Sequence, residues 1–170
     1  IPQVLRNINA FALGARLANP KATTQVIFTG DWSMPVKEAE ATNSLIDQGC
    51  DVLTCHVDGP KTVMENAARR GAMVSGYHVS AAPLVPKAYL TGAEWNWEAV
   101  YPKFVTIFAD GETIPNFYRG GLKEGVVKVS PYGSMVSAEA RKLADDVKSK
   151  LMAGSYVIFK GPLVDNKGKT

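Results

Sequence analysis

Long apolar runs and a marked excess of charge of either sign are both missing from this sequence. No stretch approaches the roughly 18 to 20 uninterrupted apolar residues that a membrane-spanning helix needs. Nineteen Lys and Arg against sixteen Asp and Glu leave a formal net charge of +3, without the run of basic residues that is typical of a nucleic-acid surface. We therefore expect neither a membrane-spanning protein nor a nucleic-acid partner.

Cysteine is scarce, and the two cysteines present are expected to be free thiols. Cys50 and Cys55 flank a segment with the pattern of a strand, which would hold them roughly 16 Å apart at about 3.3 Å per residue. A disulfide bond needs Cα atoms within roughly 7 Å of each other. The sequence therefore excludes a disulfide scaffold and predicts two small apolar residues packed in the core.

Signatures of phosphate binding and of acyl transfer are absent as well. The chain has no Gly-Lys-Ser/Thr loop, and the Gly120-Gly121-x-x-x-Gly125 segment lacks the preceding strand and following helix of a dinucleotide site. No Gly-x-Ser-x-Gly turn is present to supply a nucleophilic serine. We expect neither a nucleotide-phosphate site nor an acyl-transfer hydrolase.

What the chain does contain is an alternation of strands and helices. Its 170 residues, 46% hydrophobic and 21% charged, can bury the core of one ordinary domain. Periodicity predicts helices over 4–18, 35–48, 60–70, 97–110 and 137–154, and strands over 25–29, 51–55, 72–76, 89–93, 126–130 and 157–159. This order predicts an α/β fold, a three-layer sandwich in which helices cover both faces of a mainly parallel sheet.

Aromatic and polar residues gather just after the predicted strands. Ligands of open parallel sheets bind outside the carboxyl ends of the strands, so the residues at those ends are the candidates for a binding site. They are Asp31, Trp32, His56, Asp58, Tyr77, His78, Trp95 and Asn96. Such a set suits a flat, neutral heterocycle held by stacking and by hydrogen bonds along its edge.

An enzyme is the alternative that the same residues leave open. Cys55, His56, Asp58 and His78 could form a metal site or an acid/base pair that processes a nucleoside. Metal sites usually show ligand pairs at helical or hairpin spacing, and this group has none. We therefore predict no catalytic residue, no metal ligand and no cofactor.

Five segments, spread from one end of the chain to the other, form a specific combination of motifs. They are Ile1 to Ala15, Trp32-x-x-Pro35-x-Lys37-Glu38-Ala39, Leu45-Ile46-x-Gln48-Gly49-x-Asp51-Val52, Gly76-Tyr77-His78, and Gly161-Pro162-Leu163-x-Asp165-Asn166-x-Gly168. Together they resemble the basic membrane protein family, the substrate-binding components of ABC importers. This family is similar in fold to the two-lobed type I periplasmic binding proteins.

The resemblance implies a longer protein of which this chain is a part. Members of the family are roughly twice as long, so residues 1–95 would be the second ligand-binding lobe and 96–170 the segment that crosses back to the other lobe. The resemblance also implies a monomer that is periplasmic or anchored outside the cytoplasm and delivers its ligand to an ABC transporter permease. A ligand-sensing domain of a transcription regulator can share this fold and stays open as an alternative.

The family resemblance further implies a purine base or nucleoside as the ligand. Trp32 lies where family members stack an aromatic ring on the purine. Where ribose-binding members carry an acidic loop, this chain has Gly76-Tyr77-His78-Val79-Ser80. A neutral imidazole offers one donor and one acceptor, which match a purine edge better than the hydroxyls of a sugar. We therefore expect the free base, adenine or a close relative, to bind better than its nucleoside.

Overall fold

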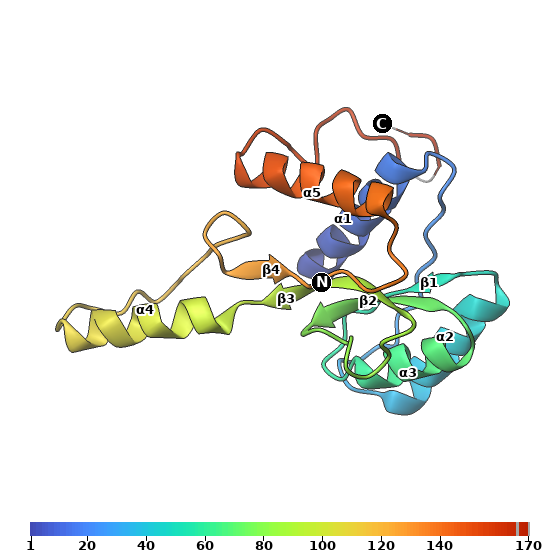
Figure 1. Ribbon diagram of the computed structural model, residues 1–170, viewed down its shortest axis with the longest axis horizontal. Helices are drawn as coiled ribbons and strands as arrows, with labels where there is room; N and C mark the ends of the chain where they lie inside the picture. Colours follow the sequence, from blue (N-terminus) through green and yellow to red (C-terminus); the bar gives the residue numbers. More distant parts are fainter. Residues whose placement is uncertain (166, 170) are drawn as a thin grey trace. The chain divides into compact units, whose positions relative to one another are not determined.

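A four-stranded sheet organises the larger of two structural units in a computed structural model that describes residues 1–165 and 167–169 (Figure 1). The larger unit covers Val26–Arg141. Its strands, in the order β1-β2-β3-β4, are Val52–Leu53, Met73–His78, Tyr89–Trp95 and Val127–Val129. The first three are parallel, and β4 is antiparallel to β3. The predicted α/β fold with a mainly parallel sheet is therefore confirmed.

One side of this sheet is covered by helices α2 (Pro35–Asp47) and α3 (Lys61–Arg69). α3 packs against β1 and β2, and α2 packs beside α3. Pro35 begins α2 as the sequence predicts, because a proline in the first turn loses no helical hydrogen bond. Glu38 then reaches back, and its Oε1 accepts a hydrogen bond from the backbone N–H of Met34 at 2.9 Å. The loop that precedes α2 is thereby fixed at its end.

The hydrophobic core lies between α3 and the sheet. Its central side chains are at most 3% exposed: Leu53, Met64, Ala67, Val74 and Tyr89. Complete burial of a side chain as large as Leu or Met stabilises a fold by roughly 1.5 to 3 kcal/mol. This core holds β1, β2 and β3 in place, and the carboxyl ends of these strands carry the predicted site.

The centre of the β2–β3 pairing is a close contact between two glycines. Gly76 and Gly92 are paired residues of the two strands, and a Cβ atom on Gly92 would lie 2.7 Å from the carbonyl oxygen of Gly76. It would also lie 2.8 Å from the Gly76 Cα. Only a residue without a side chain fits here, because the atoms opposite are rigid backbone.

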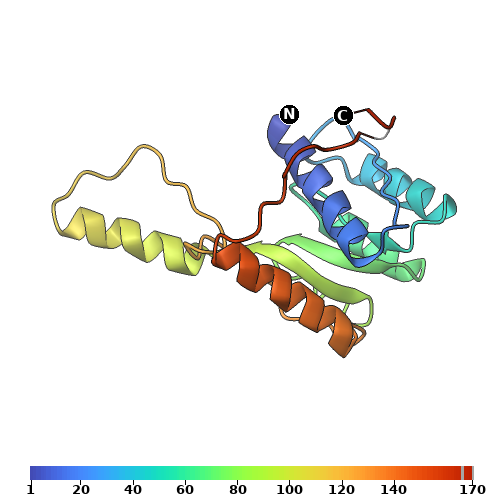
Figure 2. The same ribbon diagram turned by 90° about the horizontal axis from the view of Figure 1, so that it is seen from above.

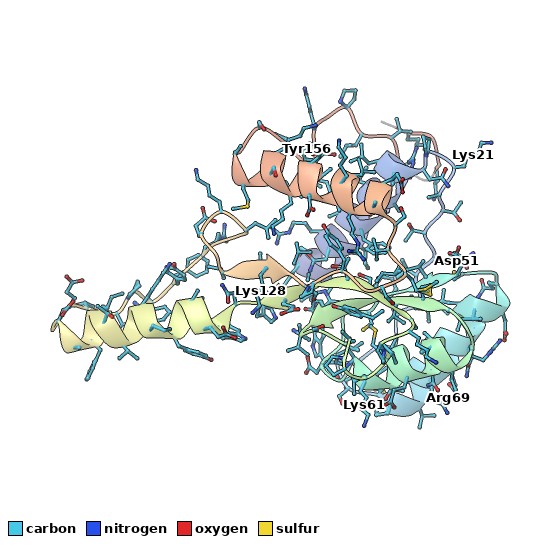
Figure 3. All side chains as sticks on the ribbon, viewed as in Figure 1. Lys21, Asp51, Lys61, Arg69, Lys128 and Tyr156 are labelled. Carbon is cyan, nitrogen blue, oxygen red and sulfur yellow. The ribbon has the colours of Figure 1, made fainter. Side chains whose placement is uncertain are left out.

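Helix α4 (Trp97–Ala109) begins directly after β3 and continues away from the end of that strand (Figure 2). The segment after α4 returns to β4, so β3 and β4 become neighbours (Figure 1). Lys128 on β4, labelled in Figure 3, lies 3.8 Å from carboxylate oxygens of both Glu94 on β3 and Glu98 on α4. These ion pairs join the end of β3, the start of α4 and β4.

The smaller unit is built from Ile1–Gln25 and Lys142–Thr170. It contains helix α1 (Pro2–Ala18) and most of helix α5 (Ala138–Met152), which begins within the larger unit. Ser137 caps α5 as predicted, since its hydroxyl oxygen accepts a hydrogen bond from the Ala140 N–H at 3.1 Å. Within residues 1–165 and 167–169, no helix combines the length and apolarity that crossing a membrane requires. Asn166 of the terminal motif lies outside the described residues.

Two predicted strands, 25–29 and 157–159, are wrong. Residues 25–29 form no strand, and Val26, Ile27 and Phe28 are 40 to 66% exposed. Residues 157–159 are irregular and end in a turn. Both segments have the composition of strands, but a strand exists only where a neighbouring backbone pairs with it, and composition does not reveal that neighbour.

The predicted loop over 77–87 begins too early. β2 continues through Tyr77 and His78, and β3 continues through Trp95. The backbone pairs Tyr77 with Ala93 and His78 with Glu94, which extends the ladder beyond the apolar runs. Tyr77, His78 and Trp95 therefore lie on strand ends and have fixed backbones, whereas the sequence placed them in loops.

Replacement of Gly92 by Ala tests the glycine contact. The added methyl group must push the backbones of β2 and β3 apart, and overpacking of this kind costs about 1 to 3 kcal/mol. We expect a clearly lower midpoint of thermal unfolding, measured by circular dichroism. Gly59→Ala is the matched control, because a Cβ there meets nothing within 4 Å. Equal midpoints for the two variants would contradict the proposed strain.

Candidate ligand-binding site

Five rings lie in a row along the carboxyl ends of the parallel strands. We call Trp32, His56, Tyr77, His78 and Trp95 the ring row. Successive ring centres are 5.8 Å apart from Trp32 to His56, 4.4 Å to Tyr77, 3.8 Å to His78 and 6.3 Å to Trp95. The structure thus brings together the aromatic and imidazole side chains that the sequence predicted to meet at this edge.

The tryptophan at the start of the ring row lies in a loop held by hydrogen bonds on both sides. The backbone N–H of Trp32 donates to Oδ1 of Asp31 at 2.6 Å, and its carbonyl oxygen accepts from the N–H of Asp58 at 2.7 Å. The second bond ties the loop after β1 to the loop before α2. Trp32 is 42% exposed, so its ring keeps an accessible face.

The far end of the ring row is held by a side-chain hydrogen bond. The indole N–H of Trp95 donates to Nδ1 of His78 at 2.7 Å. His78 has a backbone φ of +70°, in the left-handed region that residues with a side chain rarely adopt. Local strain of this kind is concentrated at functional sites. The acceptor nitrogen that the sequence interpretation assigned to a purine edge is therefore already engaged by Trp95.

Two side chains of the ring row, His56 and Tyr77, have pKa values shifted toward their neutral forms. Burial lowers the pKa of His56, and the neighbouring His78 lowers it further, while Asp58 opposes both. Burial is also the main reason why the pKa of Tyr77 rises to about 12, with Cys55 and Asp58 adding to it. At neutral pH the row therefore presents an uncharged imidazole at His56 and an uncharged phenol at Tyr77.

Two of the predicted site residues make local contacts that fix the backbone. Asp31 accepts the N–H of Trp32, as described above. The side-chain amide of Asn96 donates to the carbonyl oxygen of Gly125 at 2.8 Å, and its backbone N–H donates to Val126 at 2.9 Å. Asn96 thus anchors the segment that returns to β4. Asp58 is exposed beside His56 and Tyr77, whose pKa values it influences.

The ring row continues onto α4 through two residues that the sequence interpretation did not include in the site. The ring centres of Trp95 and Trp97 are 5.9 Å apart, and Trp97 stacks on Tyr101 at 5.4 Å. Both side chains are exposed. The spacing of four residues between Trp97 and Tyr101, directly after a strand-end tryptophan, is the signal that could have revealed this extension.

The histidines considered for acid/base or metal chemistry are separated by an aromatic ring. His56 and His78 each contact Tyr77, with ring centres 4.4 and 3.8 Å away. In the part of the chain that the structure describes, no three His, Cys, Asp or Glu side chains are grouped so that they could hold a metal ion. The arrangement instead offers ring faces and edges to a ligand.

Comparison with known proteins assigns the family. Residues 1–159 match the family model of Bmp, described as PnrA-like substrate-binding proteins of ABC transporters. The chain belongs to the Bmp family. The resemblance seen in the sequence motifs is therefore confirmed.

Bmp relatives of known name differ in the ligand that their names give. A purine-binding protein of Brucella abortus is 32% identical over 168 residues, which are 99% of this chain and 47% of the relative. A Haloferax volcanii protein, named as a candidate glucose-binding protein of an ABC transporter, is 32% identical over 161 residues, 95% of this chain and 41% of that protein. The chain thus spans less than half the length of these curated relatives.

Solved structures share the fold of this Bmp chain. A solute-binding protein of Conexibacter woesei has a TM-score of 0.74 at 22% identity, over 94% of this chain and 55% of that one. One from Aeropyrum pernix scores 0.72 at 17% identity, over 95% and 56%. A transcriptional activator of the comK gene from Bacillus halodurans scores 0.69 at 23% identity, over 75% and 45%. The fold is therefore shared by transport proteins and by a regulator.

Cys55, which directly precedes His56 in the chain, provides a test of how buried this region is. Both cysteines are free, as predicted, and burial together with the nearby Glu38 raises the pKa of Cys55 to about 12. Because only the thiolate reacts, a Cys50→Ser variant should resist alkylation by iodoacetamide up to about pH 10 and react readily once unfolded, where a thiol has a pKa of about 8.5. Mass spectrometry measures the labelling. Rapid labelling of folded protein at pH 8 would show that Cys55 is open to solvent.

Proposed function

We propose that this chain forms one wall of the site in which an ABC-importer substrate-binding protein captures a purine base, adenine or a close relative. Membership of the Bmp family supports the transport role. The observation that supports a purine as the ligand is the ring row, in which burial favours the neutral forms of His56 and Tyr77. A ring of this row that stacks on a flat heterocycle contributes about 1 to 3 kcal/mol.

The ring row favours a purine over a sugar. The two relatives at 32% identity are named for a purine and for glucose, so identity alone does not separate these ligands. Glucose presents hydroxyl groups around its whole ring, and these need several carboxylates or amides as partners. At this edge the carboxylate of Asp31 and the side-chain amide of Asn96 already bond to the protein's own backbone. Stacking surfaces are what the site has in abundance.

The residue at the end of β2, His78, supports a preference for the free base over its nucleoside. A carboxylate holds the two neighbouring hydroxyls of ribose best, because charge-assisted hydrogen bonds are roughly twice as strong as neutral ones. Position 78 carries a histidine instead, and its Nδ1 already accepts a hydrogen bond from Trp95. Asp58 is an exposed carboxylate beside the row, and it or Asp31 could take over the ribose contact.

The remaining features of this proposal come from the family. Substrate-binding proteins of ABC transporters deliver their ligand to a membrane permease, and they act outside the cytoplasm. We extend both properties to this chain, together with a monomeric state for the intact protein. Residues 1–95 would form the second ligand-binding lobe, and 96–170 the segment that crosses back to the other lobe. The ligand would then be enclosed between lobes.

Trp32→Ala in the intact gene product tests the stacking role. Loss of one stacked ring should weaken adenine binding roughly 5- to 150-fold without unfolding the protein. Isothermal titration calorimetry measures the affinity, and circular dichroism measures the fold. Phe117→Ala is the control, because Phe117 is an exposed aromatic residue outside the ring row and should leave binding unchanged. A Trp32→Ala protein that unfolds would assign Trp32 a structural role, and a folded one with unchanged affinity would refute the stacking role.

Competition between adenine and adenosine tests the choice of base over nucleoside. We expect adenine to displace radiolabelled adenine at lower concentrations than adenosine, because the ribose finds no carboxylate at position 78. Glucose at millimolar concentrations should not compete. If adenosine competes as well as adenine, the preference is refuted and Asp31 or Asp58 becomes the candidate ribose contact. Displacement by glucose instead would refute the purine itself.

A further inference from the structure

The hydrogen bond between Trp95 and His78 determines which nitrogen of His78 carries the proton. An indole N–H is a donor only, so Nδ1 of His78 must be the acceptor of the 2.7 Å bond. A neutral imidazole has one protonated and one unprotonated nitrogen. The hydrogen-bond partner of one nitrogen therefore determines which of the two carries the proton. With Nδ1 unprotonated, the proton of His78 lies on Nε2.

The residues on both sides of Trp95 fix the position of β3 next to β2, where this hydrogen bond forms. His78 is paired with Glu94, the residue before Trp95, in the last step of the β2–β3 ladder. Ser130 donates to the carboxylate of Glu94, and Lys128 lies 3.8 Å from the same group. Asn96, the residue after Trp95, donates hydrogen bonds to the carbonyl oxygens of Val126 and Gly125. The backbone of Trp95 therefore cannot move away from His78 without breaking contacts of β3 with β4.

The side chain of His78 is also confined by its own strand. Its ring centre lies 3.8 Å from that of Tyr77, and its backbone has a φ of +70°. Left-handed backbone at a residue with a side chain costs free energy and persists only where the surroundings enforce it. The imidazole is therefore oriented before any ligand arrives, with Nδ1 toward Trp95 and Nε2 as its remaining polar atom.

On the basis of the proposed function, we propose that His78 is a specificity-determining residue that presents a hydrogen-bond donor, Nε2–H, to the ligand. The site then selects heterocycles with an acceptor, a ring nitrogen or a carbonyl oxygen, at the point that meets His78. A heterocycle with a C–H, an N–H or an amino group there leaves the donor unpaired. A buried donor without a partner weakens binding by roughly 5- to 150-fold.

Deaza analogues of adenine identify the acceptor. In 1-deaza-, 3-deaza- and 7-deazaadenine, a C–H replaces a different ring nitrogen and the ring keeps its shape. Calorimetry on the intact gene product should show that one analogue binds roughly 5- to 150-fold more weakly than adenine. His78→Gly, which tolerates the left-handed backbone, should lose that difference. If all analogues bind like adenine, or if the difference persists in His78→Gly, the role of His78 is overturned.

Trp95→Phe tests the hydrogen bond itself. The variant keeps an aromatic ring but lacks the indole N–H, so both tautomers of His78 become accessible and the penalty for the selective analogue should shrink several-fold. Tyr118→Phe is the control, because it removes an aromatic hydrogen bond, from Lys103 at 3.0 Å, outside the ring row. It should leave the penalty unchanged. An unaltered penalty in Trp95→Phe would show that the tautomer does not set the choice.

Nitrogen-15 NMR of the histidine rings gives a readout that needs no ligand. Unliganded protein should show one histidine, absent from the spectrum of His78→Gly, with a protonated Nε2 and an unprotonated, hydrogen-bonded Nδ1. A protonated Nδ1 would overturn the inference even if purines bind. If the NMR signature is present but no purine binds, the proposed function fails while the assigned tautomer of His78 stands. The NMR spectrum and the binding measurement together therefore distinguish failure of the inference from failure of the proposed function.

Discussion

The arrangement of the site depends on the close approach of two parallel strands at a pair of glycines. At Gly76 and Gly92 the backbones of β2 and β3 are so close that no side chain fits between them. The residues that follow this contact, Tyr77 and His78 on β2 and Trp95 on β3, are therefore brought together at the strand ends. A wider separation of the strands would remove the hydrogen bond between Trp95 and His78 and divide the ring row.

Burial is the second constraint, and it acts on charge. It raises the pKa of Tyr77 and of Cys55 and lowers that of His56, in each case as the largest cause. All of these shifts favour the neutral form. The burial that stabilises the unit therefore also keeps these three side chains uncharged at neutral pH.

Much of the fold could be predicted from the sequence because its signals are local. Pro35 and Ser137 mark helix starts, and the apolar runs around Val52, Val74 and Leu90 mark strands of the sheet. The strands predicted over 25–29 and 157–159 failed because pairing is a property of two segments, and one segment cannot reveal it.

The meeting of the ring-row side chains at one edge of the sheet was predictable, but the hydrogen bonds among them were not. Parallel strands end at one edge, so His56 and Tyr77 could be expected to meet there. Trp32 meets them too, although the strand predicted before it, over 25–29, does not exist. The acceptor role of His78 Nδ1 could not be foreseen, because its partner Trp95 lies 17 positions away and the distance between them depends on the strand register. The extension of the ring row to Trp97 and Tyr101 was not predicted. The sequence shows that a helix begins at Trp97, but not that these two rings continue the row from Trp95.

The hydrogen bonds that hold the ring row also have an entropic consequence. Trp95 is bonded through its indole, and the loop of Trp32 is fastened on both sides of that residue. Freezing a mobile side chain on association costs about 0.5 to 1.5 kcal/mol. For the indole of Trp95 part of that ordering has already taken place during folding, and for Trp32 the backbone beneath the ring is already fixed. Any molecule that packs against these rings therefore meets side chains with less conformational entropy left to lose.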